Sequence, residues 1–126
     1  MDERVRKAIF QRVKEEPFAR KMNIELVELD LGHSVVEMTF TEDMENIFGM
    51  AHGGAVFALI DEAFETAGNS HGTVAVALNM NITYTAAAAP SRTATYDIKV
   101  TDEKQTLIAV CQALIYRKKD PLPFLD

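Results

Sequence analysis

Apolar residues recur along the chain with a helical period in some segments and a strand period in others. Residues 3–15 have a helical period that predicts an amphipathic helix, which Pro17 closes. The apolar positions of this helix are four residues apart, at Val5, Ile9 and Val13. Residues 24–31 and 34–41 are expected to form a pair of strands around Gly32, since the second segment alternates with a period of two.

The middle of the chain joins a polar loop to a long apolar segment. Residues 42–53 are expected to form the loop, and a central helix is expected to run from residue 54 to residue 69. Gly68 and Gly72 mark the end of this helix.

The last third of the chain alternates with the period of β-strands. Residues 74–84 and 93–101 each alternate strictly and predict two long strands. Residues 102–105 predict a hairpin turn. Residues 106–116 are apolar at almost every position, which predicts a strand covered on both faces. Residues 118–123 contain two prolines and are not expected to continue a central strand, because proline lacks an N–H donor.

Composition and charge narrow the class of protein. The 126 residues predict one domain over 1–126, and 48% hydrophobic residues are enough for its core. The net charge of −6 argues against a general nucleic-acid binder. The single cysteine excludes an internal disulfide framework and favours a reducing cytoplasm. The charged amino terminus has no apolar signal core, and no apolar run approaches the ~20 residues that span a bilayer. A cytoplasmic protein without membrane segments is therefore expected.

The sequence His52-Gly53-Gly54 lies where the loop meets the central helix. The first N–H groups of a helix have no acceptor within the helix, and glycines leave them uncovered. The helix dipole adds roughly half a positive charge at the same place. Such a helix end suits a carbonyl oxygen that becomes an oxyanion.

Asp61 is a lone candidate for general-base or nucleophilic chemistry inside this apolar segment. It follows Gly53 by eight residues, which is about 12 Å along a helix. A base must come within about 3 Å of its target, so the two groups of one chain cannot easily serve the same atom. Two such helices, antiparallel across a two-fold axis, would bring Asp61 of one chain beside Gly53 of the other. A catalytic site would then be shared between subunits.

The predicted order of elements suits an antiparallel sheet wrapped around one apolar helix. This order resembles that of the hotdog-fold acyl-CoA thioesterases, and most closely the phenylacetate-pathway (PaaI-type) group. The resemblance rests on a spaced set of residues, Asn46, Gly49, His52, Gly53, Gly54 and Asp61. Residues 79–84 and Pro90 resemble the next strand and turn of the family, so that roughly residues 18–117 are covered. The fold class implied is α+β, with a hotdog architecture.

The resemblance implies a role for each matching position. Asp61 matches the catalytic carboxylate, which activates water or attacks the thioester directly. Gly53 matches the backbone donor that polarises the thioester carbonyl, with Gly54 beside it at the substrate. Asn46 matches a polar residue near the reacting centre, and His52 matches one that supports the loop. The implied substrate is an acyl-CoA, without cofactor or metal, in a homodimer or homotetramer.

Two positions depart from the family pattern. Some relatives have a serine or threonine that positions water where this chain has Ala77, whose methyl group cannot do so. The turn after Pro90 contains Arg92 where a Gly-Asp is common, so contacts with coenzyme A are expected to differ there. In an acidic protein the candidates for its phosphates are basic residues, namely Arg92, Arg117, Lys118 and Lys119.

Other interpretations of the same residues remain open. On a helical wheel the polar residues of the central helix share one side, which suggests a solvated face made of Asp61, Glu62, Glu65, Thr66 and Asn69. Glu65 is one turn from Asp61 and can influence its pKa. Asn46 can be a turn residue, and His52 can satisfy a backbone group. The three histidines have no metal-ligand spacing.

Two other functions also remain open. A hotdog hydratase or dehydratase needs a catalytic histidine with an acidic partner, which His52 and Asp61 fit less well. A non-catalytic acyl-CoA-binding module would hold the ester without turnover.

Overall fold

The chain folds as an α+β structure, seen in a computed structural model that describes residues 1–87, 93–96, 99–101 and 107–125. Its helices are α1 (Glu3–Glu15), α2 (Pro17–Lys21) and α3 (Gly53–Asn69), with a short 3-10 helix, η1 (Glu42–Met44). Its strands are β1 (Ile24–Asp30), β2 (His33–Thr39), β3 (Thr73–Tyr84), β4 (Thr93–Tyr96), β5 (Lys99–Thr101) and β6 (Leu107–Pro121).

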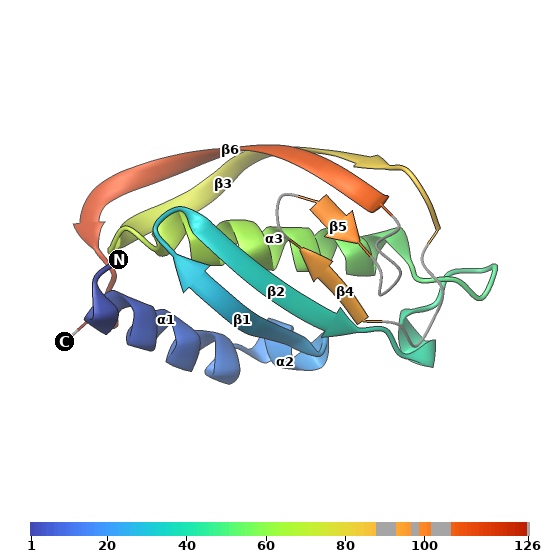
Figure 1. The fold of residues 1–126 in the computed structure, drawn as a ribbon, viewed down its shortest axis with the longest axis horizontal. Coiled ribbons are helices and arrows are strands. Elements are labelled where there is room, and N and C mark those ends of the chain that lie inside the picture. Colours follow the sequence, from blue (N-terminus) through green and yellow to red (C-terminus); the bar gives the residue numbers. More distant parts are fainter. Residues whose placement is uncertain (88–92, 97–98, 102–106, 126) are drawn as a thin grey trace.

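The described strands form one antiparallel sheet of six strands in the order β1-β2-β4-β5-β6-β3. Figure 1 shows the sheet curving around α3, with β3 and β6 on one side and β1 and β2 on another. Helix α1 packs against β1, beside the edge of the sheet. The predicted antiparallel sheet around one central helix is therefore confirmed.

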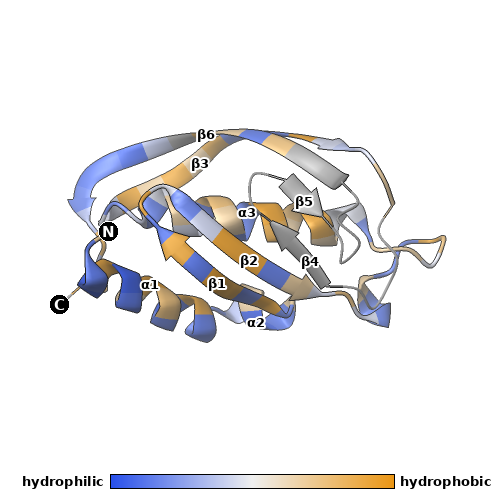
Figure 2. Ribbon diagram, viewed as in Figure 1, coloured by the Kyte–Doolittle hydropathy of each residue, from blue (hydrophilic) through white to orange (hydrophobic). Residues whose placement is uncertain are grey.

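Helix α1 has the predicted bounds because its sequence carries both its start and its end. The Asp2 carboxylate accepts a hydrogen bond of 2.8 Å from the Arg4 N–H and caps the first turn. Its buried side chains are the three that the periodicity predicts, Val5, Ile9 and Val13. Hydrophilic residues lie between them, as Figure 2 shows. Pro17 then begins α2, so the chain cannot continue α1 in a straight line.

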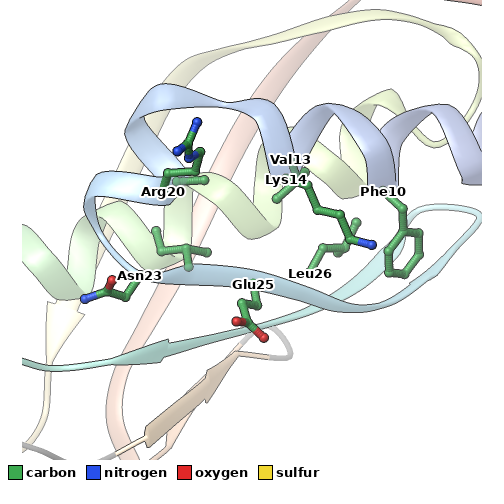
Figure 3. A pocket seen from close by; sticks show the side chains of 9 residues that line it. Phe10, Val13, Lys14, Arg20, Asn23, Glu25 and Leu26 are labelled. Carbon is green, nitrogen blue, oxygen red and sulfur yellow. The ribbon is translucent and has the colours of Figure 1, made fainter.

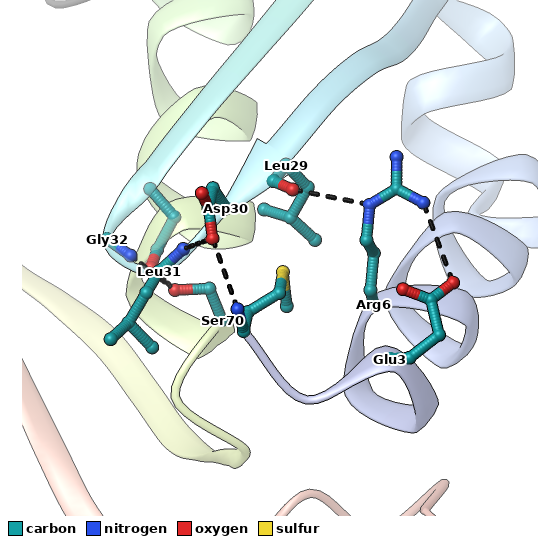
Figure 4. Close-up of polar contacts among 9 residues, drawn as sticks. Glu3, Arg6, Leu29, Asp30, Leu31, Gly32 and Ser70 are labelled. Carbon is teal, nitrogen blue, oxygen red and sulfur yellow. Dashed lines mark hydrogen bonds and ion pairs between the residues drawn. The ribbon is translucent and has the colours of Figure 1, made fainter.

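Polar contacts join α1, the β1–β2 turn and the end of α3 (Figure 4). The Arg6 side chain donates to the Leu29 carbonyl at 3.4 Å, and the amino-terminal ammonium donates to Asp30 at 3.3 Å. Gly32 has a φ of 70°, which favours glycine, and its N–H donates to the Ser70 hydroxyl at 2.7 Å. These bonds hold α1 beside the carboxyl-terminal half of α3, where the acidic residues of that helix lie.

Residues 93–101 form two strands, where the sequence predicts one. β4 and β5 pair antiparallel, with Thr95 opposite Thr101 and Tyr96 opposite Val100, so the chain reverses direction between them. The alternation of apolar and polar residues does not reveal this reversal, because it continues through residues 97–98, which lie outside the described residues. The predicted turn at 102–105 also lies outside them.

β6 is longer than predicted and reaches Pro121, although its last residues are charged. β5 pairs only with Leu107–Val110, so β3 is the described neighbour of the rest of β6. One side of this later part of β6 is thus an edge, where proline is tolerated. Residues 118–121 therefore continue β6 as an edge, and not as the central strand that the prolines were predicted to exclude.

The outer face of β3 and β6 carries exposed hydrophobic side chains. Leu114 and Tyr116 are 61% and 56% exposed, so the prediction that this strand is covered on both faces is wrong for the single chain. On β3, Val76 and Leu78 are also exposed, because shifts of register near Thr73 and Ala77 interrupt the predicted alternation. Apolar surface of this kind favours contact with another molecule.

The described residues contain no helix long and apolar enough to cross a membrane.

Candidate active site

His52 caps the amino terminus of α3. Its backbone is extended, and its Nδ1 accepts a hydrogen bond of 2.8 Å from the Gly54 N–H. Its own N–H donates to the Met44 carbonyl at 2.8 Å, which ties the helix start to η1. The imidazole thus uses one ring nitrogen to hold the helix end. This geometry favours a supporting role for His52 over proton transfer.

The Gly53 N–H is the first-turn donor that remains available. Within the described residues no hydrogen bond from it is formed, whereas the Gly54 N–H is taken by His52. The Gly53 carbonyl accepts a bond of 2.8 Å from the Tyr84 hydroxyl at the end of β3. A Cβ atom at Gly53 would lie 3.3 Å from that hydroxyl and from the ring, so glycine allows Tyr84 to approach the helix end.

The Asn46 side chain organises the loop before α3. Its Oδ1 accepts hydrogen bonds from the Phe48 N–H at 2.8 Å and the Met50 N–H at 3.2 Å. Its backbone N–H donates to the Met50 carbonyl at 2.8 Å, and its carbonyl accepts from Gly49, whose φ is 70°. Asn46 is therefore a turn residue in this structure, and the loop it builds leads directly to Gly53.

A pocket of about 390 Å³ brings Asn46 and Gly53 together. Its other lining residues come from the start of α3 and the end of β3, namely Ala51, Val56, Tyr84, Thr85, Ala86 and Ala87. An electrophilic group entering this pocket meets the positive end of α3 and the Gly53 N–H. Asp61 does not line it.

Asp61 lies two turns further along α3 and is exposed. Partial burial of its carboxylate raises its pKa above the ordinary value. Its charge in turn raises the pKa of three neighbouring carboxyls, Glu16, Glu62 and Glu65. The single chain thus separates Asp61 from the pocket at Gly53, as the helix length predicts.

Glu62 is buried, contrary to the predicted solvated face of the central helix. It is only 3% exposed, and burial together with the charges of Glu16, Glu65 and Asp61 raises its pKa to about 8. Thr66 on the same side is 2% exposed. The helical wheel cannot show that another element covers a polar face. Here Glu16, at the junction of α1 and α2, lies over this side of α3.

The remaining candidate residues are placed as follows. Arg92 lies outside the described residues, so its predicted contact with coenzyme A stays a prediction. Ala77 is exposed on β3. Cys111 is buried, and burial raises the pKa of its thiol. Lys118 and Lys119 are exposed near the end of β6.

Sequence reasoning missed Tyr84 as part of the site. Its hydroxyl reaches a carbonyl 31 residues earlier in the chain. The sequence did place Tyr84 at the end of a predicted strand. The partner of its hydroxyl could be identified only once the fold was known.

A larger pocket of about 440 Å³ lies between α1, α2 and β1 (Figure 3). Phe10, Val13 and Leu26 line it together with the charged side chains of Lys14, Arg20 and Glu25. It contains none of the residues predicted for catalysis, and it lies away from the amino terminus of α3. The pocket at Gly53 is therefore the candidate active site.

Comparison with known proteins identifies the family. Residues 48–123 match the model of the thioesterase superfamily, a span that includes Gly53, Asp61 and Tyr84. The chain belongs to this superfamily, and the enzyme class and hotdog fold expected from the sequence are confirmed.

Individual relatives agree with this assignment. Acyl-coenzyme A thioesterase PaaI of Escherichia coli is 34% identical to this chain, over 79% of this chain and 81% of the length of PaaI. The solved PaaI structure superposes with a TM-score of 0.88 over 94% of this chain and 96% of that chain, at 26% identity. An Archaeoglobus fulgidus protein with the name "putative esterase" is 31% identical over 98% of this chain and 87% of its own length. A Streptococcus mutans protein solved with acetyl CoA has a TM-score of 0.75 over 79% of this chain and 92% of its own, at 23% identity, which shows a shared fold.

Proposed function

We propose that this enzyme hydrolyses the thioester of a small or aryl acyl-CoA to the free acid and coenzyme A. The observation that carries the proposal is the available Gly53 N–H at the positive end of α3, beside a pocket built by Asn46 and Tyr84. A thioester carbonyl needs such a donor where its oxygen gains negative charge. The likeness to PaaI, an acyl-CoA thioesterase, supports coenzyme A as the thiol.

The chemical step requires a base or a nucleophile as well as the donor. A water molecule attacks the carbonyl carbon, and the Asp61 carboxylate takes a proton from it. The Gly53 N–H stabilises the tetrahedral oxyanion until the carbon–sulfur bond breaks and the coenzyme A thiolate leaves and is protonated. Alternatively, Asp61 attacks the carbonyl itself, the carbon–sulfur bond breaks and the coenzyme A thiolate leaves, and water then hydrolyses the resulting anhydride to the free acid and the Asp61 carboxylate. Both routes place Asp61 at the reacting carbon.

The proposed site is completed by a second subunit. Asp61 lies about 12 Å along α3 from Gly53 and does not line the pocket at Gly53. An antiparallel α3 from a partner would supply the missing carboxylate. β3 is an edge of the described sheet, and exposed edges tend to pair or be covered. We therefore propose a homodimer, or a homotetramer that also covers Leu78, Leu114 and Tyr116, acting in the cytoplasm.

The test is turnover of a panel of short, long and aryl acyl-CoAs, followed by release of free thiol. Release from a subset of the panel is expected, with the size of the acyl group setting kcat/KM. Light scattering at assay concentration should show at least a dimer. No release from any ester would refute the proposal, and tight binding without release would identify an acyl-CoA-binding module.

The same panel separates hydrolysis from hydration. The His52 ring already accepts a hydrogen bond from Gly54, which leaves it poorly suited to be the catalytic base of a hydratase. Crotonyl-CoA should therefore show no hydration by absorbance.

A further inference from the structure

Three carboxylates meet where α1 and α2 join beside α3. Glu16 comes from the junction of the two amino-terminal helices, and Glu62 and Glu65 come from one side of α3. One oxygen from each lies within 4.8 Å of the others. Like charges at such distances repel, and they are stable together only with shared protons or with a cation.

The environment of Glu62 indicates that this cluster binds a ligand. It is 3% exposed, and its Oε1 atom has no hydrogen-bond partner within the described residues. A buried carboxylate oxygen without a donor costs free energy, so native proteins nearly always satisfy it. The neighbouring Glu16 and Glu65 carboxylates can donate a hydrogen bond to this oxygen only when they are protonated.

Among the described residues, Arg12 is the positive side chain whose charge acts on Glu16, and it also contacts two other groups. Arg12 lies 4.0 Å from the Glu15 carboxylate, and its guanidinium lies over the Phe124 ring at 5.4 Å from the centroid. It acts on Glu16 more weakly than the burial of that carboxyl does. The charged groups that act on Glu62 are all acidic, namely Glu16, Glu65 and Asp61.

The cluster opens to a pocket that would hold the rest of a coordination shell. This pocket has a volume of about 350 Å³ and is lined by Glu16 and Glu65 together with Thr66 and Asn69. Carboxylate oxygens and water are the ligands of hard divalent cations, which bind oxygen at about 2.0–2.6 Å. Two oxygens on opposite sides of such an ion are up to about 5 Å apart, which the spacing of the cluster matches.

We propose that Glu16, Glu62 and Glu65 bind one hard divalent cation, of the class of Ca²⁺, Mn²⁺ or Mg²⁺, with water at the open positions. The ion ties the junction of α1 and α2 to the middle of α3, one residue from Asp61. Its role is structural, and it takes no part in the proposed hydrolysis. The inference goes beyond the proposed function and departs from the expectation of no metal, which rested on the family resemblance and on the spacing of the histidines.

The experiment is a binding and melting measurement on the full chain. The wild type, stripped of metal with a chelator, is titrated separately with Ca²⁺, Mn²⁺ and Mg²⁺. Its melting temperature should rise and saturate with at least one of them, as for a ligand that binds the folded state alone. Calorimetry, or electron paramagnetic resonance for Mn²⁺, should give one ion per chain.

Two variants localise the ion. Glu62→Gln keeps the shape of the side chain and should weaken binding at least about tenfold, since even an outer-shell partner contributes that much. Glu28→Gln removes the same charge from an exposed position on β1 and should bind as the wild type does. The proposal is overturned if none of the three ions raises the melting temperature, or if Glu62→Gln binds with wild-type affinity. Neither measurement depends on turnover, so failure here leaves the proposed function untouched.

Discussion

Asp61 is the candidate residue whose proposed role depends on its charge. Asp61→Asn keeps the size of the side chain and removes the base or nucleophile. We expect kcat to fall about 10²-fold or more, the usual contribution of a general base, with little change in substrate binding. Steady-state kinetics on the best acyl-CoA measures both quantities.

The matched control is Asp120→Asn, which removes an exposed carboxylate near the end of β6 and should leave kcat unchanged. Near-normal kcat in Asp61→Asn would move the chemistry to Glu65 or to another residue.

The Tyr84 hydroxyl acts on the site through Gly53. Tyr84→Phe removes the 2.8 Å bond to the Gly53 carbonyl and keeps the ring that lines the pocket. One such bond contributes about 0.5–1.5 kcal/mol, so kcat/KM should fall about two- to tenfold. Tyr116→Phe, on the exposed face of β6, serves as the control. Equal kinetics for wild type and Tyr84→Phe would show that the Tyr84 hydroxyl does not contribute to the site.

Residue types and spacing predict part of this site. The sequence places a donor at Gly53, and it predicts that the helix separates Asp61 from that donor. It also leaves open a turn role for Asn46, which the hydrogen bonds to Phe48 and Met50 support. Tyr84 could not be predicted, because its partner lies far away in the chain. The burial of Glu62 could not be predicted either, because it depends on where Glu16 lies.

At the scale of elements, the contact between α3 and the α1–α2 junction should be sensitive to pH. Burial raises the pKa of Glu62 from 4.5 to about 8, so between these values the folded state holds a proton that the unfolded state has released. Stability therefore falls as pH rises through this window, by at most about 1.4 kcal/mol per pH unit. Urea unfolding across the window, in metal-free buffer, measures the slope.

Glu62→Gln removes this titration. The variant should lose most of the slope and be more stable than the wild type near pH 8 in metal-free buffer. Glu28→Gln should keep the wild-type slope. A slope that Glu62→Gln leaves unchanged would show that Glu62 is ionised in the folded protein throughout this range.

Elements with a local cause were predicted well. Asp2 caps the start of α1 and Pro17 follows its end, and the bounds of this helix agree with the prediction. Elements whose limits depend on pairing were predicted less well. The alternating sequence of residues 93–101 does not reveal that β4 and β5 pair antiparallel. β6 extends to Pro121 because one of its sides has no described neighbour there.

At the scale of the whole molecule, the proposed site makes a prediction about pairs of subunits. Two inactive variants are prepared, Asp61→Asn and Gly53→Pro. The second removes the N–H donor, and proline is tolerated in the first turn of a helix. When the two are mixed by denaturation and refolding, each heterodimer has one site with both lesions and one site with neither. Activity should return to about half of the wild-type value per heterodimer, if the sites act independently and each takes one group from each chain.

The controls separate the lost donor from a damaged fold. Any side chain at Gly53 places a Cβ atom 3.3 Å from Tyr84, so the ring must move by a few tenths of an ångström. Gly53→Ala has the same Cβ atom and keeps the N–H, and it should therefore retain far more activity than Gly53→Pro. Circular dichroism of each homodimer checks that both variants fold. If donor and carboxylate served the same site from one chain, every site in the mixture would keep a lesion. Well-folded heterodimers would then stay inactive, and the shared site would be rejected.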